Sequence, residues 1–145
     1  MTQRILVMGL PGAGKTTLAE LLVDQLRASG KTVTWFNADE VREKFNDWDF
    51  SYEGRIRQSI RMFELAVQCN GDFAICDFVA PLAEMRENYK ADWTVWMDTI
   101  TVSRFEDTNR AFDPPKVYDF RVTEQDAGKW AGIVSDHILH YSYST

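Results

Sequence analysis

Short apolar runs alternate along the chain with longer stretches in which apolar residues recur every three or four positions. Four runs predict buried strands at 4–8, 33–36, 73–76 and 94–97, and residues 118–122 alternate like a fifth. After the first strand, the apolar face of a helix is formed by Leu18, Leu21, Leu22 and Leu26. The stretches between strands predict helices at 15–29, 39–44, 51–68, 82–89, 101–107 and 124–140.

The order of these elements predicts the fold class. Strands that alternate with helices indicate an α/β protein, here one domain over residues 1–145 with a parallel sheet of about five strands and helices on both faces. In the helix at 51–68, which Ser51 is placed to cap, the residues expected to face inward are Ile56, Ile60, Phe63 and Val67. Ligands of such sheets bind at the carboxyl ends of the strands, so functional residues are expected there.

A glycine-rich loop follows the first strand. Residues 9–16 fit the phosphate-binding pattern G-x-x-x-x-G-K-[ST], between a strand and a helix as that motif requires. Glycines let several backbone N–H groups point at one phosphate, and the helix adds its positive dipole end. Lys15 is expected to reach the β- and γ-phosphates, and the Thr16 hydroxyl to ligate Mg²⁺. The motif predicts ATP and Mg²⁺ as cofactors on a three-layer P-loop NTPase fold of the nucleoside-monophosphate-kinase-like type. The expected nucleotide contacts are Gly9, Leu10, Pro11, Gly12, Ala13, Gly14, Lys15, Thr16 and Thr17.

Composition narrows the classes of partner. The 145 residues are 45% hydrophobic and 26% charged, as in ordinary soluble globular proteins. The formal net charge of −6 disfavours nucleic acid and anionic membranes, so neither is expected as a partner. Cys69 and Cys76 lack metal-type spacing and are expected to be reduced thiols. No signal pattern or long apolar run is present, which predicts a cytoplasmic protein.

Several segments together resemble the adenylylsulfate kinase family. The loop at 9–17 is similar to that family's G-L-S-G-A-G-K-[ST]-T, and residues 37–42 (N-A-D-E-V-R) to its D-G-D-N-V-R. The segment that begins with Phe50-Ser51 resembles F-S-x-x-D-R-x-E-N-I-R-R, and residues 78–86 resemble F-I-S-P-x-x-x-x-R. Met97-Asp98-Thr99 resembles the V-D-T after the family's fourth strand. The order and rough spacing hold to about residue 100.

The resemblance implies a kinase that moves the γ-phosphate of ATP to the 3′-hydroxyl of adenosine 5′-phosphosulfate, a step of sulfate assimilation. Asp39 is then placed to accept or orient the acceptor's hydroxyl proton, beside Lys15 as the second catalytic residue. Arginine forks suit phosphate and sulfate oxygens, and aromatic rings can stack on a base. The substrate contacts that follow are Asp39, Arg42, Phe50, Arg55, Gln58, Phe78, Val79 and Pro81. A homodimer is left open.

This chain departs from the family pattern at several positions. Asn37 stands where the family has its first Asp, and Gly54 where it has the Asp before Arg55; Glu40, Gln58 and Ala80 also differ. The chain is also shorter than the family norm. A related kinase of another small molecule, nucleoside or modified nucleotide therefore remains an alternative. A non-catalytic nucleotide-binding module is a second alternative, although Lys15 and Thr16 are both present.

Further candidate site residues are predicted only from their positions relative to the expected strands and loops. Asp77 ends the third strand, where many phosphate-loop enzymes carry an acidic Mg²⁺ partner, so it is predicted with Thr16 as the metal site. Arg104 and Arg110 flank an acidic stretch in front of a proline loop, and a short lid near 104–116 would bring them to the nucleotide. The five tryptophans are expected in the core. His137 and His140 are expected to have no catalytic role.

Overall fold

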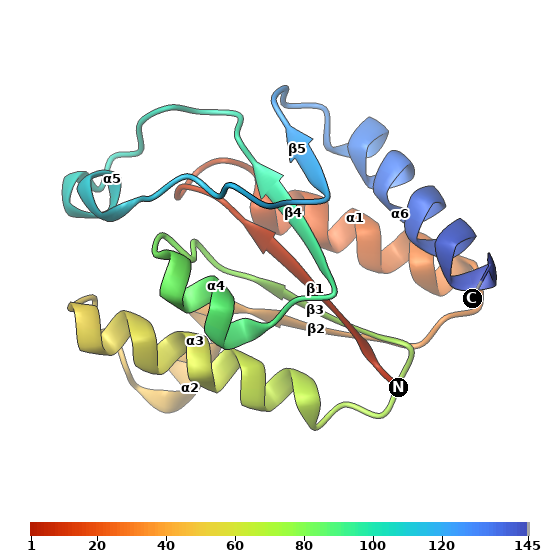
Figure 1. Cartoon of the computed structure of the whole chain (residues 1–145), viewed down its shortest axis with the longest axis horizontal. Helices are drawn as coiled ribbons and strands as arrows, with labels where there is room; N and C mark the ends of the chain where they lie inside the picture. Colours follow the sequence, from red (N-terminus) through yellow and green to blue (C-terminus); the bar gives the residue numbers. More distant parts are fainter. Residues whose placement is uncertain (145) are drawn as a thin grey trace.

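The fold is a parallel five-stranded sheet covered by helices on both faces. The computed structural model describes residues 1–144. Its strands are β1 (Gln3–Met8), β2 (Val33–Asn37), β3 (Phe73–Asp77), β4 (Trp93–Met97) and β5 (Phe120–Val122). They lie in the order β2-β3-β1-β4-β5, and every neighbouring pair is parallel (Figure 1). The predicted sheet is confirmed.

Within residues 1–144, six helices complete the three layers. They are α1 (Lys15–Ala28), α2 (Ala38–Phe45), α3 (Tyr52–Val67), α4 (Ala83–Tyr89), α5 (Glu106–Ala111) and α6 (Ala127–Ser144). α1 and α6 pack together on one face of the sheet, and α3 and α4 lie on the other (Figure 1). Side chains of β1 alternate between the two cores: Ile5 and Val7 join the α1–α6 cluster, whereas Leu6 and Met8 join the α3–α4 cluster. Within the described residues, no helix is both long and apolar enough to cross a membrane.

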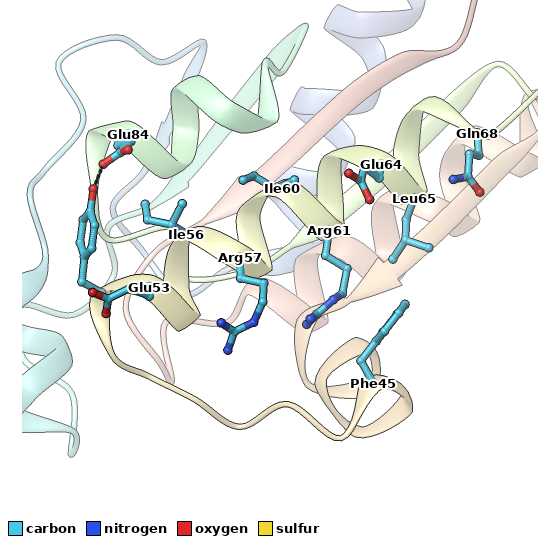
Figure 2. Close-up of a pocket in the computed structure, with 11 residues that line it drawn as sticks. Phe45, Glu53, Ile56, Arg57, Ile60, Arg61, Glu64, Leu65, Gln68 and Glu84 are labelled. Atoms are coloured by element: carbon cyan, nitrogen blue, oxygen red, sulfur yellow. Dashed lines mark hydrogen bonds between the residues drawn. The ribbon is translucent and has the colours of Figure 1, made fainter.

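The predicted inner face of α3 was right for Ile56 and Phe63, which are partly buried against the α3–α4 cluster, and wrong for Ile60 and Val67. Ile60 is 43% exposed and Val67 is 47% exposed. The residues that α3 buries are Gly54, Arg55, Gln58, Ser59, Met62 and Ala66. Because Arg55 and Gln58 find hydrogen-bond partners in the interior, the helix turns them inward. A surface groove of about 700 Å³ runs along α3, and the exposed Ile60 lines it together with the partly buried Ile56 and Leu65 (Figure 2).

Two predicted helices begin later than expected. α5 starts at Glu106, not at residue 101, because Ser103 and Asn109 hold the preceding turn together. The Ser103 hydroxyl donates to Asn109 Oδ1 at 2.7 Å, and Asn109 Nδ2 donates back to the Ser103 carbonyl at 2.8 Å. α6 starts at Ala127 because residues 124–126 form a turn.

Candidate active site

The glycine loop curls between β1 and α1 in a conformation that requires glycine. Gly9 has φ +146°, and a Cβ atom there would lie 2.4 Å from the Met97 carbonyl oxygen. Gly14, in the left-handed region at φ +94°, is the N-cap of α1. The far side of the loop is tied down by Thr99, whose hydroxyl donates to the Ala13 carbonyl at 2.7 Å. The helix therefore starts with its free N–H groups facing the strand ends.

A cleft of about 580 Å³ opens above this loop at the carboxyl ends of β1, β2 and β3. Most of the predicted site residues line it: Pro11, Gly12, Lys15, Thr16, Asp39, Arg42, Phe50, Arg55, Gln58, Asp77, Phe78, Val79, Pro81 and Arg104. The remaining loop residues do not line the cleft, and Leu10 and Ala13 are buried. Arg110 does not line it either; its guanidinium is exposed and pairs with Glu106 at 3.5 Å.

Lys15 and Asp77 face each other across the floor of the cleft. Lys15 Nζ donates to the Leu10 carbonyl at 3.1 Å. Burial lowers the pKa of Lys15 to about 8, against the attraction of Asp77 and Asp39. Burial likewise raises the pKa of Asp77 to about 6, although hydrogen bonds and Lys15 favour its charged form. Desolvation outweighs pairing at both groups, and a bound polyphosphate would supply negative charge that favours the protonated form of Lys15.

The Asp77 carboxylate is held from several directions. Trp35 Nε1 donates to Oδ2 at 2.6 Å, and Asn37 Nδ2 donates to Oδ1 at 3.0 Å. The Thr16 hydroxyl donates to Oδ1 at 3.4 Å. The described residues contain no cluster of three or more acidic, histidine or cysteine side chains that could hold a metal. A hydroxyl beside one carboxylate instead fits an ion that takes its other ligands from phosphate and water.

Two arginines form the opposite wall. Arg42 is 5% exposed and Arg55 is 6% exposed. The Arg42 guanidinium lies 4.3 Å from the Phe50 ring centroid and donates to the Asp47 and Asp49 carbonyls. Arg55 donates to the Phe50 carbonyl at 2.9 Å and to the Thr108 hydroxyl at 3.1 Å. These arginines therefore present positive charge from fixed positions.

The loop at 46–51, which carries Phe50, is anchored to α3 by ion pairs. Asp47 accepts hydrogen bonds from Arg57 at 2.8 Å and from Arg61 at 2.9 Å. Figure 2 shows both arginines extending from α3 toward this loop. They hold the pKa of Asp47 far below its usual range. Asp49 pairs with Arg57 at 3.1 Å.

Other predicted acceptor residues already have contacts of their own. Gln58 Nε2 donates to the Ala38 carbonyl at 3.2 Å, and its Oε1 accepts from Arg61 at 2.9 Å. Phe78 is 3% exposed and packs edge-to-face on Tyr89, so it belongs to the core as much as to the cleft. Asp39 is exposed in the first turn of α2, at the mouth of the cleft.

The placement of all five tryptophans in the core was wrong for Trp48. Trp48 is 50% exposed and lines the cleft, with its ring centroid 6.5 Å from that of Phe50. Trp35 was also missed as a site residue, since its indole holds Asp77. The signal for Trp35 was its place two residues before the polar end of a strand, which puts it on the same face as Asn37.

Comparisons with known proteins find similar kinases. The adenylylsulphate kinase family model matches residues 1–121. A probable adenylyl-sulfate kinase of Pseudomonas aeruginosa is 32% identical over 101 residues, which are 68% of this chain and 47% of that protein. A cytidine diphosphoramidate kinase of Campylobacter jejuni is 28% identical over 85 residues, 59% of this chain and 49% of that protein. The matched segments thus span about half the length of these curated relatives.

The solved structure of the Mycobacterium tuberculosis APS kinase in complex with AMPPNP and APS has the same fold. It superposes with a TM-score of 0.77 at 22% identity, over 93% of this chain and 96% of that chain. The family model covers most of the chain, including the glycine loop, β2, the 46–51 loop and β3. This chain therefore belongs to the adenylylsulphate kinase family.

Proposed function

We propose that this chain is an ATP-dependent kinase that phosphorylates the 3′-hydroxyl of adenosine 5′-phosphosulfate. The observation that supports this most is the wall formed by Arg42, Arg55 and Phe50 opposite the phosphate loop. Two buried guanidinium groups beside an aromatic ring suit an acceptor that carries both an anion and a base. Relatives named adenylyl-sulfate kinase, and a fold neighbour determined with AMPPNP and APS, support the same acceptor.

Each of the site residues would have a separate role in the proposed reaction. Lys15 and the loop amides would bind the β- and γ-phosphates and stabilise charge as the phosphoryl group moves. Thr16 and Asp77 would hold Mg²⁺, which neutralises phosphate charge when bound. The acceptor oxygen bonds to the γ-phosphorus as the bond from that phosphorus to the β–γ bridging oxygen breaks, and ADP leaves. The hydroxyl proton passes to the Asp39 carboxylate. Since ATP is the donor, we place the reaction in the cytoplasm.

A second acceptor class is favoured by one observation. Both ends of the Gln58 amide are engaged, by Ala38 and by Arg61, so the amide is less available to an acceptor. Gln58 is also a position where this chain differs from the family pattern. The relative named cytidine diphosphoramidate kinase is an example of a similar chain with a different acceptor. The alternative is therefore a kinase of another nucleotide or small-molecule hydroxyl.

The deciding experiment measures ADP release with ATP and Mg²⁺, with and without adenosine 5′-phosphosulfate. Acceptor-dependent release, with phosphate found on the 3′-oxygen, supports the proposal. Stimulation by a cytidine nucleotide but not by adenosine 5′-phosphosulfate would replace the acceptor and keep the kinase. ATP binding without turnover for any acceptor would favour a non-catalytic nucleotide-binding module.

A further inference from the structure

The Asp77 carboxylate is fixed by side chains that lie on the neighbouring strand. β2 and β3 pair in parallel with Asn37 opposite Asp77 and Trp35 opposite Ile75. Paired residues of adjacent strands point to the same face of a sheet, about 4.8 Å apart. Trp35, two residues before Asn37, shares that face. The carboxyl ends of β2 and β3 therefore bring an indole N–H, an amide and a carboxylate together on one face of the sheet.

The Asn37 side chain also caps α2, and this contact sets its orientation. Its Oδ1 accepts a hydrogen bond from the Glu40 backbone N–H at 3.1 Å, which caps α2. Because the oxygen faces the helix, the amide nitrogen must face Asp77 and Thr16. It lies 3.0 Å from Asp77 Oδ1 and 3.3 Å from the Thr16 hydroxyl. The capping contact thus fixes the amide nitrogen in place as a hydrogen-bond donor to Asp77.

Trp35 fixes the other carboxylate oxygen. Its indole N–H is 2.6 Å from Asp77 Oδ2, whereas the hydroxyl of Thr16 is close to Oδ1. A carboxylate with a donor on each oxygen has one favoured rotamer. In this rotamer Oδ1 is turned toward Thr16, the residue that the phosphate-loop motif assigns to the metal.

We propose that Trp35 and Asn37 are positioning residues that aim Asp77 at the metal beside Thr16, and that the acid and amide at these two strand ends are interchangeable. The resemblance to the family places an acid at position 37, and here the acid lies across the ladder at position 77. Swapping the two residues in this chain would keep one carboxylate and one amide on the same face. This inference rests on the proposed function only in taking a metal–nucleotide complex as the ligand.

The first test measures Mn²⁺ affinity in the presence of saturating AMPPNP and without any acceptor. The method is calorimetry, or the electron paramagnetic resonance signal of free Mn²⁺. Trp35→Phe keeps an aromatic side chain, although a smaller one, and removes the indole N–H; it should weaken Mn²⁺ binding about 10- to 100-fold, as loss of a ligand's hydrogen-bond partner does. Affinity for AMPPNP in the presence of a chelator should change less than about twofold. Asn37→Ser, which retains a capping oxygen and loses the amide, should behave similarly.

The matched control is Trp130→Phe. Trp130 lies on α6, and its indole N–H donates to Glu124 at 3.1 Å. The substitution removes the same kind of N–H group and should leave Mn²⁺ affinity unchanged. Equal Mn²⁺ affinities for Trp35→Phe and Trp130→Phe would overturn the positioning role. A purely structural role for Trp35 would lower the melting temperature and weaken nucleotide binding with and without metal together, which also overturns it.

The second test is the reciprocal exchange. Asp77→Asn should lose most of the Mn²⁺-dependent gain in AMPPNP affinity, and the double variant Asn37→Asp/Asp77→Asn should recover at least a tenth of the wild-type Mn²⁺ affinity. Aspartate at position 37 can still cap α2, so the double variant is expected to fold. A double variant as weak as Asp77→Asn would overturn the interchange. Because no acceptor is present, an inactive acceptor assay would overturn the proposed function while these binding results still support the positioning role.

Discussion

Replacement of Gly54 by alanine tests how closely the 46–51 loop packs on α3. Gly54 lies in the first turn of α3, and its backbone N–H donates to the capping hydroxyl of Ser51 at 3.2 Å. A Cβ atom at this position would lie 2.1 Å from the Asp49 carbonyl oxygen and 2.7 Å from its carbonyl carbon. An ordinary carbon–oxygen contact lies at about 3.3 Å or more. The loop backbone, and Phe50 with it, would have to move by about 1 Å.

Two opposing terms set the magnitude. Alanine in place of glycine in a helix gains about 0.5–1 kcal/mol. Forcing an extra carbon into a closely packed site costs about 1–3 kcal/mol, and the atoms it meets here are backbone rather than a flexible side chain. We expect a net loss of about 1–2 kcal/mol in the free energy of unfolding. A shift of Phe50 by about 1 Å should also lower kcat/KM for the acceptor by about 10- to 100-fold.

Urea unfolding of wild type, Gly54→Ala and Gly128→Ala measures the stability effect. Gly128 lies in the first turn of α6, and beyond the neighbouring backbone of its own helix no atom lies within 4 Å of a Cβ built there. Gly128→Ala should therefore leave stability unchanged or raise it by up to about 1 kcal/mol. If Gly54→Ala were as stable as Gly128→Ala and kept full acceptor affinity, the close approach of Asp49 would not constrain the loop.

Three further predictions concern the cleft and its anchors. Lys15→Ala should abolish ATP turnover with an unchanged far-ultraviolet dichroism spectrum; retained turnover would exclude Lys15 as the phosphate clamp. Arg55→Ala should raise the KM of the acceptor far more than that of ATP, and equal effects would move Arg55 out of the acceptor wall. Asp47→Asn should lower the melting temperature at pH 7. Since arginine partners depress the pKa of Asp47, its stabilisation is complete above the ordinary value of about 3.9 and is lost as the pH falls through the lower folded value. The difference between wild type and Asp47→Asn should therefore shrink below about pH 4, and a constant difference would contradict the ion-pair role.

The sheet could be predicted because its signals are local. Each apolar run is short and ends in turn residues, and the glycine loop fixes which strand comes first. Apolar periodicity predicted the face of α3 only in part, placing Ile56 and Phe63 correctly, because that rule assumes that polar residues point outward. Arg55 and Gln58 point inward and are hydrogen-bonded there, and only tertiary structure shows the partners that make this favourable.

The phosphate side of the site was more predictable than the acceptor side. Lys15 and Thr16 belong to one contiguous motif, and Asp77 was found from its place at a strand end. Trp48 and the anchoring of its loop depend on contacts between α3 and a segment without regular structure. Arg110 was expected at the nucleotide but lies on the exposed side of α5, a helix whose start is set by the pairing of Ser103 with Asn109.

The anchored 46–51 loop has a consequence for how acceptor choice can change in evolution or by engineering. The groups that hold it in place, Arg42, Arg57 and Arg61, lie within residues 42–61, as do their partners Asp47 and Asp49. One contiguous stretch therefore carries the proposed acceptor wall and most of its scaffold, while Thr108 on α5, which accepts from Arg55, lies outside it. A graft of this stretch, with threonine kept at position 108, would transfer the proposed wall between members of the family as a module and leave the proposed phosphate-binding residues of α1 and β3 in place.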